Sequence, residues 1–239
     1  MKLKIDLHCH TSFDLIEEKV CGRKGLIHPK ELIDAAIAKK FDAISITHHG
    51  IQFHNEPVER YAKSKGLLLI PGVESYIDQK HILLINFSSI KNINRYEDLC
   101  RAKNDRGLIV APHPFYMTAQ CIGRNLIRHI DCFDAIESSH FYFSIFNPNK
   151  KAQRVARHFN LPVIGNSDTH LKFQFGTTYS LVEAEEKSIP AIIKAIKQGK
   201  VECVSHPLQL KLFVKGLLWS LGEIPITLKQ LVFRLAEAI

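Results

Sequence analysis

The chain has 239 residues, 46% of them hydrophobic, which is enough to bury the core of one large domain or of a domain with an appendage. Its 32 Lys and Arg residues outnumber its 24 Asp and Glu residues, and the net charge of +8 favours anionic partners such as phosphates, nucleic acid or lipid surfaces. The basic residues are dispersed, so charge alone selects no function. The first residues lack a basic segment followed by an apolar one, and no secretory signal is therefore expected.

Short apolar runs alternate with amphipathic stretches along the chain. We expect strands at 3–7, 42–47, 67–73, 81–87, 108–112, 133–137 and 162–166. We expect helices at 28–40, 92–106, 147–159 and 188–198, the first with Pro29 near its start, where a helical turn tolerates proline. Strands that alternate with helices predict an α/β fold with a mainly parallel sheet, either open or closed into a barrel.

The last segment, residues 208–239, differs in character from the rest. It mixes Leu, Phe and Trp with basic residues, and Lys211, Lys215, Gly222 and Pro225 interrupt its apolar runs. A segment interrupted in this way cannot span a bilayer. We expect two amphipathic helices that pack on the domain, with an interfacial membrane helix or a dimer face as the alternatives.

The six cysteines stand at irregular spacings and form no C-x-x-C pair. That pattern favours free thiols in a reducing compartment over disulfides. We therefore predict a cytoplasmic protein.

His8 and His10 follow the first apolar run, two residues apart. Alternate side chains of a strand share a face, so both imidazoles can reach one metal ion while Cys9 points into the opposite layer. An H-x-H pair alone is weak evidence, because such pairs also occur on ordinary polar strand faces.

Further histidines strengthen the prediction of a metal site. Eight of the thirteen lie at or near the ends of expected strands, namely His8, His10, His48, His49, His81, His113, His140 and His170. Glu74 and Asp168 occupy equivalent places, and ligands of parallel α/β proteins gather at the carboxyl ends of strands. Imidazoles with carboxylates suit Zn, Mn or Fe. No G-x-x-x-x-G-K or G-x-G-x-x-G motif supports a nucleoside triphosphate or a dinucleotide cofactor.

Seven short motifs together resemble the PHP (polymerase and histidinol phosphatase) family of metal-dependent phosphoesterases. The resemblance runs from residue 3 to about residue 206, and the motifs appear in family order: "DLHCHTSFD" at 6–14, "ISITHHG" at 44–50, "IPGVES" at 70–75, "HILLINF" at 81–87, "APHPF" at 111–115, "DAIESSH" at 134–140 and "GNSDTH" at 165–170. Several are weak alone, whereas their joint order and spacing are specific.

The resemblance implies a distorted (β/α)7 barrel over residues 1–206, which the amphipathic tail at 207–239 would follow as a helical extension. It implies two to three divalent ions (Zn, Mn or Fe) at the carboxyl-terminal mouth. The first ion would be held by His8, His10, Glu74 and Asp168, the second by Glu74, His81 and His113, and the third by Asp14, His49 and His170. Asp14 is the least fixed of these, because Glu17 or Glu18 can take its place.

One motif departs from the family pattern. The family commonly has Asp before the histidine of the second motif, whereas this chain reads Thr47-His48-His49. His48 cannot supply the negative charge that orients a liganding imidazole, so the third ion is expected to bind more weakly or with altered pH dependence. His48 is then expected to contact substrate or to pack.

The resemblance implies hydrolysis of a phosphomonoester or phosphodiester by a hydroxide that bridges the ions, with Asp168 and His170 as catalytic residues. Arg124, His140 and His48 are the candidates for substrate binding, Arg124 through a bidentate grip on phosphate. A small phosphorylated metabolite or nucleotide is the expected substrate. The alternatives are an exonuclease that acts on short nucleic acid, and a non-catalytic metal-binding module that engages a partner or a membrane through its tail.

Overall fold

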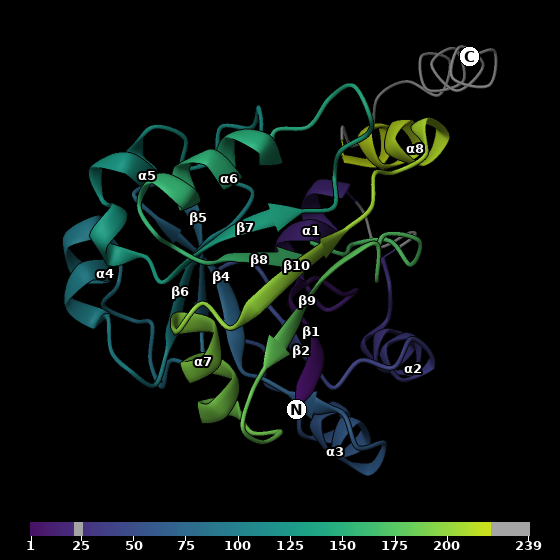
Figure 1. Ribbon diagram of the computed structural model, residues 1–239. Helices are drawn as coiled ribbons and strands as arrows, with labels where there is room; N and C mark the ends of the chain where they lie inside the picture. The colour runs from purple at the N-terminus through teal and green to yellow at the C-terminus, as the bar shows by residue number, and fades with distance from the viewer. Residues whose placement is uncertain (22–25, 221–239) are drawn as a thin grey trace.

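The structure is a computed structural model that describes residues 1–21 and 26–220 (Figure 1). Its described strands form two five-stranded sheets. The first has the order β10 (Val201–Ser205), β9 (Thr178–Glu183), β1 (Lys2–Cys9), β2 (Ala43–Ile46) and β3 (Leu68–Leu69). The second has the order β4 (Gly72–Ile77), β5 (Lys80–Ile85), β6 (Leu108–Ala111), β7 (Ala135–Ser139) and β8 (Val163–Asn166). The α/β class is confirmed, whereas closure into a (β/α)7 barrel stays a prediction because the two ladders do not join into one ring.

Both sheets mix strand directions, so the prediction of a mainly parallel sheet is wrong. The pairs β1–β2, β2–β3, β6–β7 and β7–β8 are parallel, and the pairs β1–β9, β9–β10, β4–β5 and β5–β6 are antiparallel. The hairpin between β4 and β5 turns through Asp78 and Gln79, whose φ angles of 47° and 64° match the primed turns that suit the twist of antiparallel strands.

Most helices lie around the outside of the sheets, whereas α1 overlaps the strands in this view (Figure 1). They are α1 (Leu15–Cys21), α2 (Pro29–Ala38), α3 (Glu56–Ser64), α4 (Tyr96–Ala102), α5 (Asn125–Arg128), the 3-10 turn η1 (Ile130–Cys132), α6 (Asn149–His158), α7 (Ile189–Lys197) and α8 (Leu210–Ser220). The four helices expected from the sequence contain α2, α4, α6 and α7. At α2, His28 accepts a hydrogen bond from the Lys30 N–H and Glu31 accepts one from the His28 N–H, which closes a capping box ahead of the apolar face.

The interior between the sheets is apolar at one end and polar at the other. Leu3, Ile5 and Leu7 of β1 belong to an interior cluster with residues of β5, β6 and α7, whereas Cys9 packs with the helical residues of α2. Leu7 and Cys9 are two residues apart yet join different clusters, because the register between β1 and β2 is irregular between Asp6 and Cys9. This bulge lies at the place where the histidines of β1 begin.

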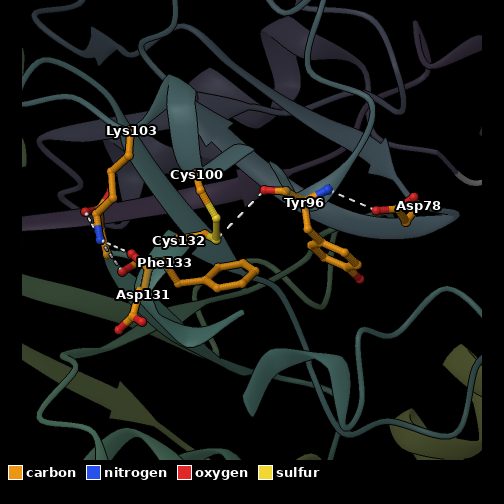
Figure 2. Close-up of a disulfide and its surroundings, with 8 residues drawn as sticks. Asp78, Tyr96, Cys100, Lys103, Asp131, Cys132 and Phe133 are labelled. Atoms are coloured by element: carbon orange, nitrogen blue, oxygen red, sulfur yellow. Dashed lines mark hydrogen bonds and ion pairs between the residues drawn. A yellow bond between two sulfur atoms is a disulfide. The ribbon is translucent and has the colours of Figure 1, made fainter. Parts of the chain in front are cut away.

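Cys100 of α4 and Cys132 of η1 form a disulfide with 4.4 Å between their Cα atoms (Figure 2). The prediction of free thiols is therefore wrong for this pair, although Cys9, Cys121 and Cys203 are free and the Cys21 side chain lies outside the described part. Lys103, which follows α4, also links the two elements, because its Nζ donates hydrogen bonds of 2.8 and 2.9 Å to the carbonyls of Asp131 and Phe133 (Figure 2).

Only the first part of the tail can be compared with the prediction. The first expected amphipathic helix is α8, and residues 221–239, where the second was expected, lie outside the described residues. Figure 1 shows α8 on the side of the molecule toward which the arrowheads of β7 and β10 point. Within residues 1–21 and 26–220, none of the helices has both the length and the apolar character that a bilayer crossing requires.

Candidate metal centre

The carboxyl ends of several strands bring the polar candidates together. His8 lies in β1 and His10 directly after it, His49 follows β2, and His113 follows β6. Asp168 and His170 follow β8, Glu74 lies within β4, and His81 opens β5. The two sheets meet at this end through isolated bridges between Cys9 and Thr169 and between His49 and Glu74. We call this junction the seam.

Glu74 lies at the centre of the cluster and is almost completely buried. Its oxygens lie within 3.3 Å of a nitrogen on each of five imidazole rings, those of His8, His10, His49, His81 and His113. The approach of His81 Nδ1 is the shortest at 2.8 Å, yet neither ring nitrogen of His81 makes a hydrogen bond within the described residues. Close approach without hydrogen-bond geometry is typical of groups that point at a common ion.

Two carboxylates behind the cluster fix the orientation of His8 and His10. Glu137 Oε2 accepts a hydrogen bond from His8 Nδ1 at 2.9 Å, and Asp14 Oδ2 accepts one from His10 Nδ1 at 2.9 Å. The Nε2 atoms therefore face inward, 3.1 Å from each other, and Asp168 Oδ1 lies 3.3 Å and 3.4 Å from them. Two imidazole nitrogens and a carboxylate oxygen at such separations need a positive charge between them, and a divalent cation fits this donor set.

Three groups of donor atoms have their members within 4.8 Å of one another: His8, His10 and Asp168; His8, Glu74 and His113; and His10, His49 and Glu74. His81 and His170, predicted as ligands, belong to none of these groups, although His81 contacts Glu74 and His170 stacks on His10 with ring centroids 4.3 Å apart. Asp14 lies behind the histidines, since its Oδ2 contacts Nδ1 of both His10 and His49.

The buried carboxylates of the cluster favour the binding of positive charge. Burial lowers the pKa of His8, but the carboxylates of Asp168, Glu137 and Glu74 outweigh that effect and raise it to about 10. Burial also lowers the pKa of His49, which Glu74 and Asp14 raise to about 9. In the absence of metal, protons supply the positive charge that these carboxylates attract.

The backbone around the cluster is adapted to bring its groups together. A Cβ on Gly72 would overlap the side chains of Ser45 and Thr47, so glycine permits the close approach of β4 to β2 that sets Glu74 beside His49. Asp168 and His113 adopt φ angles of 47° and 28°, in the left-handed region that non-glycine residues rarely occupy. Such strain is frequent at functional sites.

A cavity of about 330 Å³ opens over the cluster. Metal candidates on its lining include Glu74, His81 and Asp168, and its outer wall contains aromatic side chains and Trp219 of α8. Among the described residues that line it there is no Lys or Arg. The described part of the chain therefore places no permanent cation on the lining of this cavity.

The three residues predicted to bind substrate lie in different places. His140 lines the cavity, is buried, has no hydrogen-bond partner on either ring nitrogen among the described residues, and has a pKa lowered by burial to about 3. His48 is buried and hydrogen-bonded through Nε2 to Thr11 Oγ1 at 2.8 Å, away from the cavity. Arg124 is exposed at the start of α5 and does not line the cavity.

Sequence reasoning missed several residues of the site. Glu137 is fully buried behind His8, and Cys121 contacts His113 Nδ1 with its Sγ at 3.4 Å. Tyr116 and Trp219 line the cavity. Glu137 lies within β7 and in the "DAIESSH" motif, but the sequence does not distinguish it from other strand residues, and the other three residues carry no signal either.

Comparison with known proteins places these features in context. A family model described as "PHP domain" matches residues 6–159, and one described as "PHP-associated" matches residues 146–201. An uncharacterized protein of Methanocaldococcus jannaschii is 25% identical over 125 residues, which cover 51% of this chain and 73% of that protein.

Two solved structures share the fold. A two-domain protein of Bacteroides vulgatus, described as containing a predicted PHP-like metal-dependent phosphoesterase, is similar with a TM-score of 0.65 and 24% identity over 86% of this chain and 65% of its own. The lesion-specific endonuclease EndoQ of Pyrococcus furiosus is similar with a TM-score of 0.55 and 17% identity over 88% of this chain and 60% of its own. This chain thus spans less than two thirds of the length of either protein.

Proposed function

The chain belongs to the PHP domain family, whose model spans residues 6–159, and from that premise we propose that it is a metal-dependent phosphoesterase. Its proposed substrate is a small phosphorylated metabolite or a nucleotide, and its proposed reaction is hydrolysis of a phosphate ester. The observation that carries this proposal is the convergence of five imidazoles on the buried carboxylate of Glu74, at the floor of a cavity.

The proposed ligand set holds two to three divalent ions of Zn, Mn or Fe. His8, His10, Glu74 and Asp168 would hold the first, Glu74, His81 and His113 the second, and His49 and His170 the third. Asp14 supports the third site from behind, through its contacts with His10 and His49. When bound, divalent ions supply Lewis acidity and lower the pKa of water toward neutrality.

The chain's own residues prepare the reaction in three ways. Glu137 and Asp14 hold the Nδ1–H groups of His8 and His10, so that both Nε2 atoms face the ions. Asp168 and His170 lie on the cavity lining, where they can accept and pass on the proton of the attacking water. His140 is neutral at working pH and offers a ring N–H to a phosphate oxygen, since its nitrogens have no partner among the described residues.

The lack of Lys and Arg among the described lining residues supports a small substrate over a polymer. A nucleic acid needs basic side chains along its backbone, and each phosphate contact adds to the salt dependence of binding. The endonuclease similarity and the net charge of +8 favour cleavage of short nucleic acid as the second candidate. A steep fall in activity with added salt would favour that candidate.

The proposal is tested by elemental analysis of the purified wild type and of Glu74→Ala, with a screen of phosphate esters on the same samples. We expect two to three ions per chain in the wild type, and loss of both metal and hydrolysis in the variant. Metal-free wild type that stays inactive after Zn, Mn or Fe is added would contradict the enzyme proposal. Activity in a metal-depleted Glu74→Ala sample would contradict the metal mechanism.

A further inference from the structure

Helix α8 forms part of the cavity wall although it lies far from the metal candidates in sequence. Gly216 and Trp219 line the cavity. Phe213, one turn earlier, stacks on Phe141 with ring centroids 4.4 Å apart and lies 4.7 Å from the ring of Phe143. A Cβ on Gly216 would come within 2.9 Å of Phe141, so the helix is seated closely against the loop that follows β7.

Trp219 reaches the edge of the metal cluster. Its ring centroid lies 5.3 Å from that of His170, which itself stacks on His10 at 4.3 Å. The Nε1 atom of Trp219 is buried and has no hydrogen-bond partner among the described residues. A buried indole N–H normally has an acceptor, and the described residues leave that place open to a bound molecule.

Other residues of the cavity lining are also aromatic. Tyr76, Tyr116 and Phe141 line the cavity together with Trp219, and no Lys or Arg joins them among the described residues. Planar bases stack on such side chains, and they cover more of the aromatic faces than a sugar phosphate or an aliphatic phosphate does.

We propose that Trp219 is the specificity-determining residue of the site and that the substrate class is nucleoside monophosphates. The indole stacks on the base, and its N–H donates to an acceptor on the substrate, while the metal end of the cavity holds the phosphate. This inference rests on the proposed phosphoesterase function for its catalytic part, but binding of the nucleoside to Trp219 is independent of hydrolysis.

The first test uses fluorescence, because Trp219 is the single tryptophan of the chain. Adenosine, which has no phosphate to lose, is titrated into the full-length protein, both metal-free and loaded with Zn²⁺, with ribose as the matched probe without a base. We expect adenosine to quench or shift the emission of Trp219 in a saturable manner and ribose to leave it unchanged. An emission that does not respond to adenosine in either form would overturn the proposal.

The second test uses kinetics with adenosine 5′-monophosphate and ribose 5-phosphate, two substrates that differ only by the base. For Trp219→Leu we expect kcat/KM to fall about tenfold or more for the nucleotide, the range of a lost base–aromatic stack, and to change little for ribose 5-phosphate. Trp219→Phe keeps an aromatic ring, so its kcat/KM for the nucleotide should fall less than that of Trp219→Leu. Lys211→Ala, at an exposed position of the same helix, is the control and should match the wild type.

The outcomes separate the two proposals. Saturable quenching without hydrolysis of either substrate would retain the nucleoside site and contradict the phosphoesterase. Hydrolysis of both substrates that falls equally in Trp219→Leu, or not at all, would retain the phosphoesterase and overturn the role of Trp219. If Trp219→Leu fails to fold by circular dichroism, Trp219→Phe and the wild-type titration decide the question.

Discussion

Replacement of Glu137 by glutamine tests the carboxylate that supports His8. All three groups bonded to Glu137 are donors: His8 Nδ1 at 2.9 Å, Asn166 Nδ2 at 2.9 Å and the backbone N–H of His113 at 3.1 Å. A carboxylate accepts from all three. A glutamine of the same shape has one oxygen and one NH₂ group, so at least one buried donor must face another donor.

The less costly glutamine orientation keeps its oxygen toward His8 and Asn166 and turns its NH₂ toward the His113 N–H. An unsatisfied buried donor costs roughly 1–3 kcal/mol, and the loss of the negative charge weakens His8 as a ligand. Substitution of a group that supports a metal ligand from behind typically lowers metal affinity about 10–100-fold, or roughly 1.4–2.7 kcal/mol of binding free energy.

The assay is competition for Zn²⁺ between the protein and a chromophoric chelator, with circular dichroism as a check on folding. Glu202→Gln is the matched control, because Glu202 is exposed and pairs with Lys2 on the surface. We expect Glu137→Gln to bind Zn²⁺ at least tenfold more weakly and Glu202→Gln to bind it like the wild type. Folded Glu137→Gln with unchanged affinity would refute the claim that Glu137 orients His8.

Three further predictions concern protons, His140 and the disulfide. The pKa values of His8 (about 10) and His49 (about 9) lie above neutrality, so these rings are protonated in the metal-free chain and must lose their protons to bind metal. Zn²⁺ uptake in weak buffer should therefore release protons and tighten as pH rises; uptake without proton release would contradict this account. His140→Phe removes two buried nitrogens that have no partner in the described part of the chain, so the free energy of unfolding in urea should rise by roughly 1 kcal/mol while kcat/KM falls about tenfold. A less stable variant with normal kinetics would instead give His140 a structural role. Peptide mapping without reductant should recover Cys100 linked to Cys132, and two separate peptides would disprove the pairing.

Strands and helices with strong apolar patterns could be predicted from the sequence, and elements with mixed faces could not. The expected strands correspond to β1, β2, β5, β6, β7 and β8, while the run at 67–73 divides into β3 and the start of β4. β9 was missed because the polar residues Thr178 and Ser180 are buried on the same face as Val182. The sequence therefore lacks the alternation of apolar and polar residues that predicts a strand. In α3, only Val58 and Ala62 are buried, and two apolar residues are too few to show the 3.6-residue period that predicts a helix.

The position of the site was predictable for a different reason. Side chains at the carboxyl ends of parallel strands gather at one edge of a sheet, and the parallel pairs β1–β2, β6–β7 and β7–β8, with the bridge between His49 and Glu74, are enough to bring His8, His10, Glu74 and Asp168 together. The assignment of ligands to individual ions stays a prediction. The orienting role of Glu137 was not readable, because an acid within a short strand looks like any other strand residue until its partners are known.

The position of the candidate ligands on both sides of the seam has a consequence for the stability and abundance of the protein. His8, His10 and His49 belong to the first sheet and its loops, whereas Glu74, His113 and Asp168 belong to the second. An ion bound by both sets would be a further clasp between the two sheets, beside the isolated bridges and the hydrogen bonds from the Leu7 N–H to Asn166 and from the Ser167 N–H to Asp6. At a free metal concentration a hundred times the dissociation constant, that clasp adds about 2.7 kcal/mol against unfolding. Metal scarcity would then reduce the amount of this protein as well as its activity, because the chains without metal unfold and are degraded first.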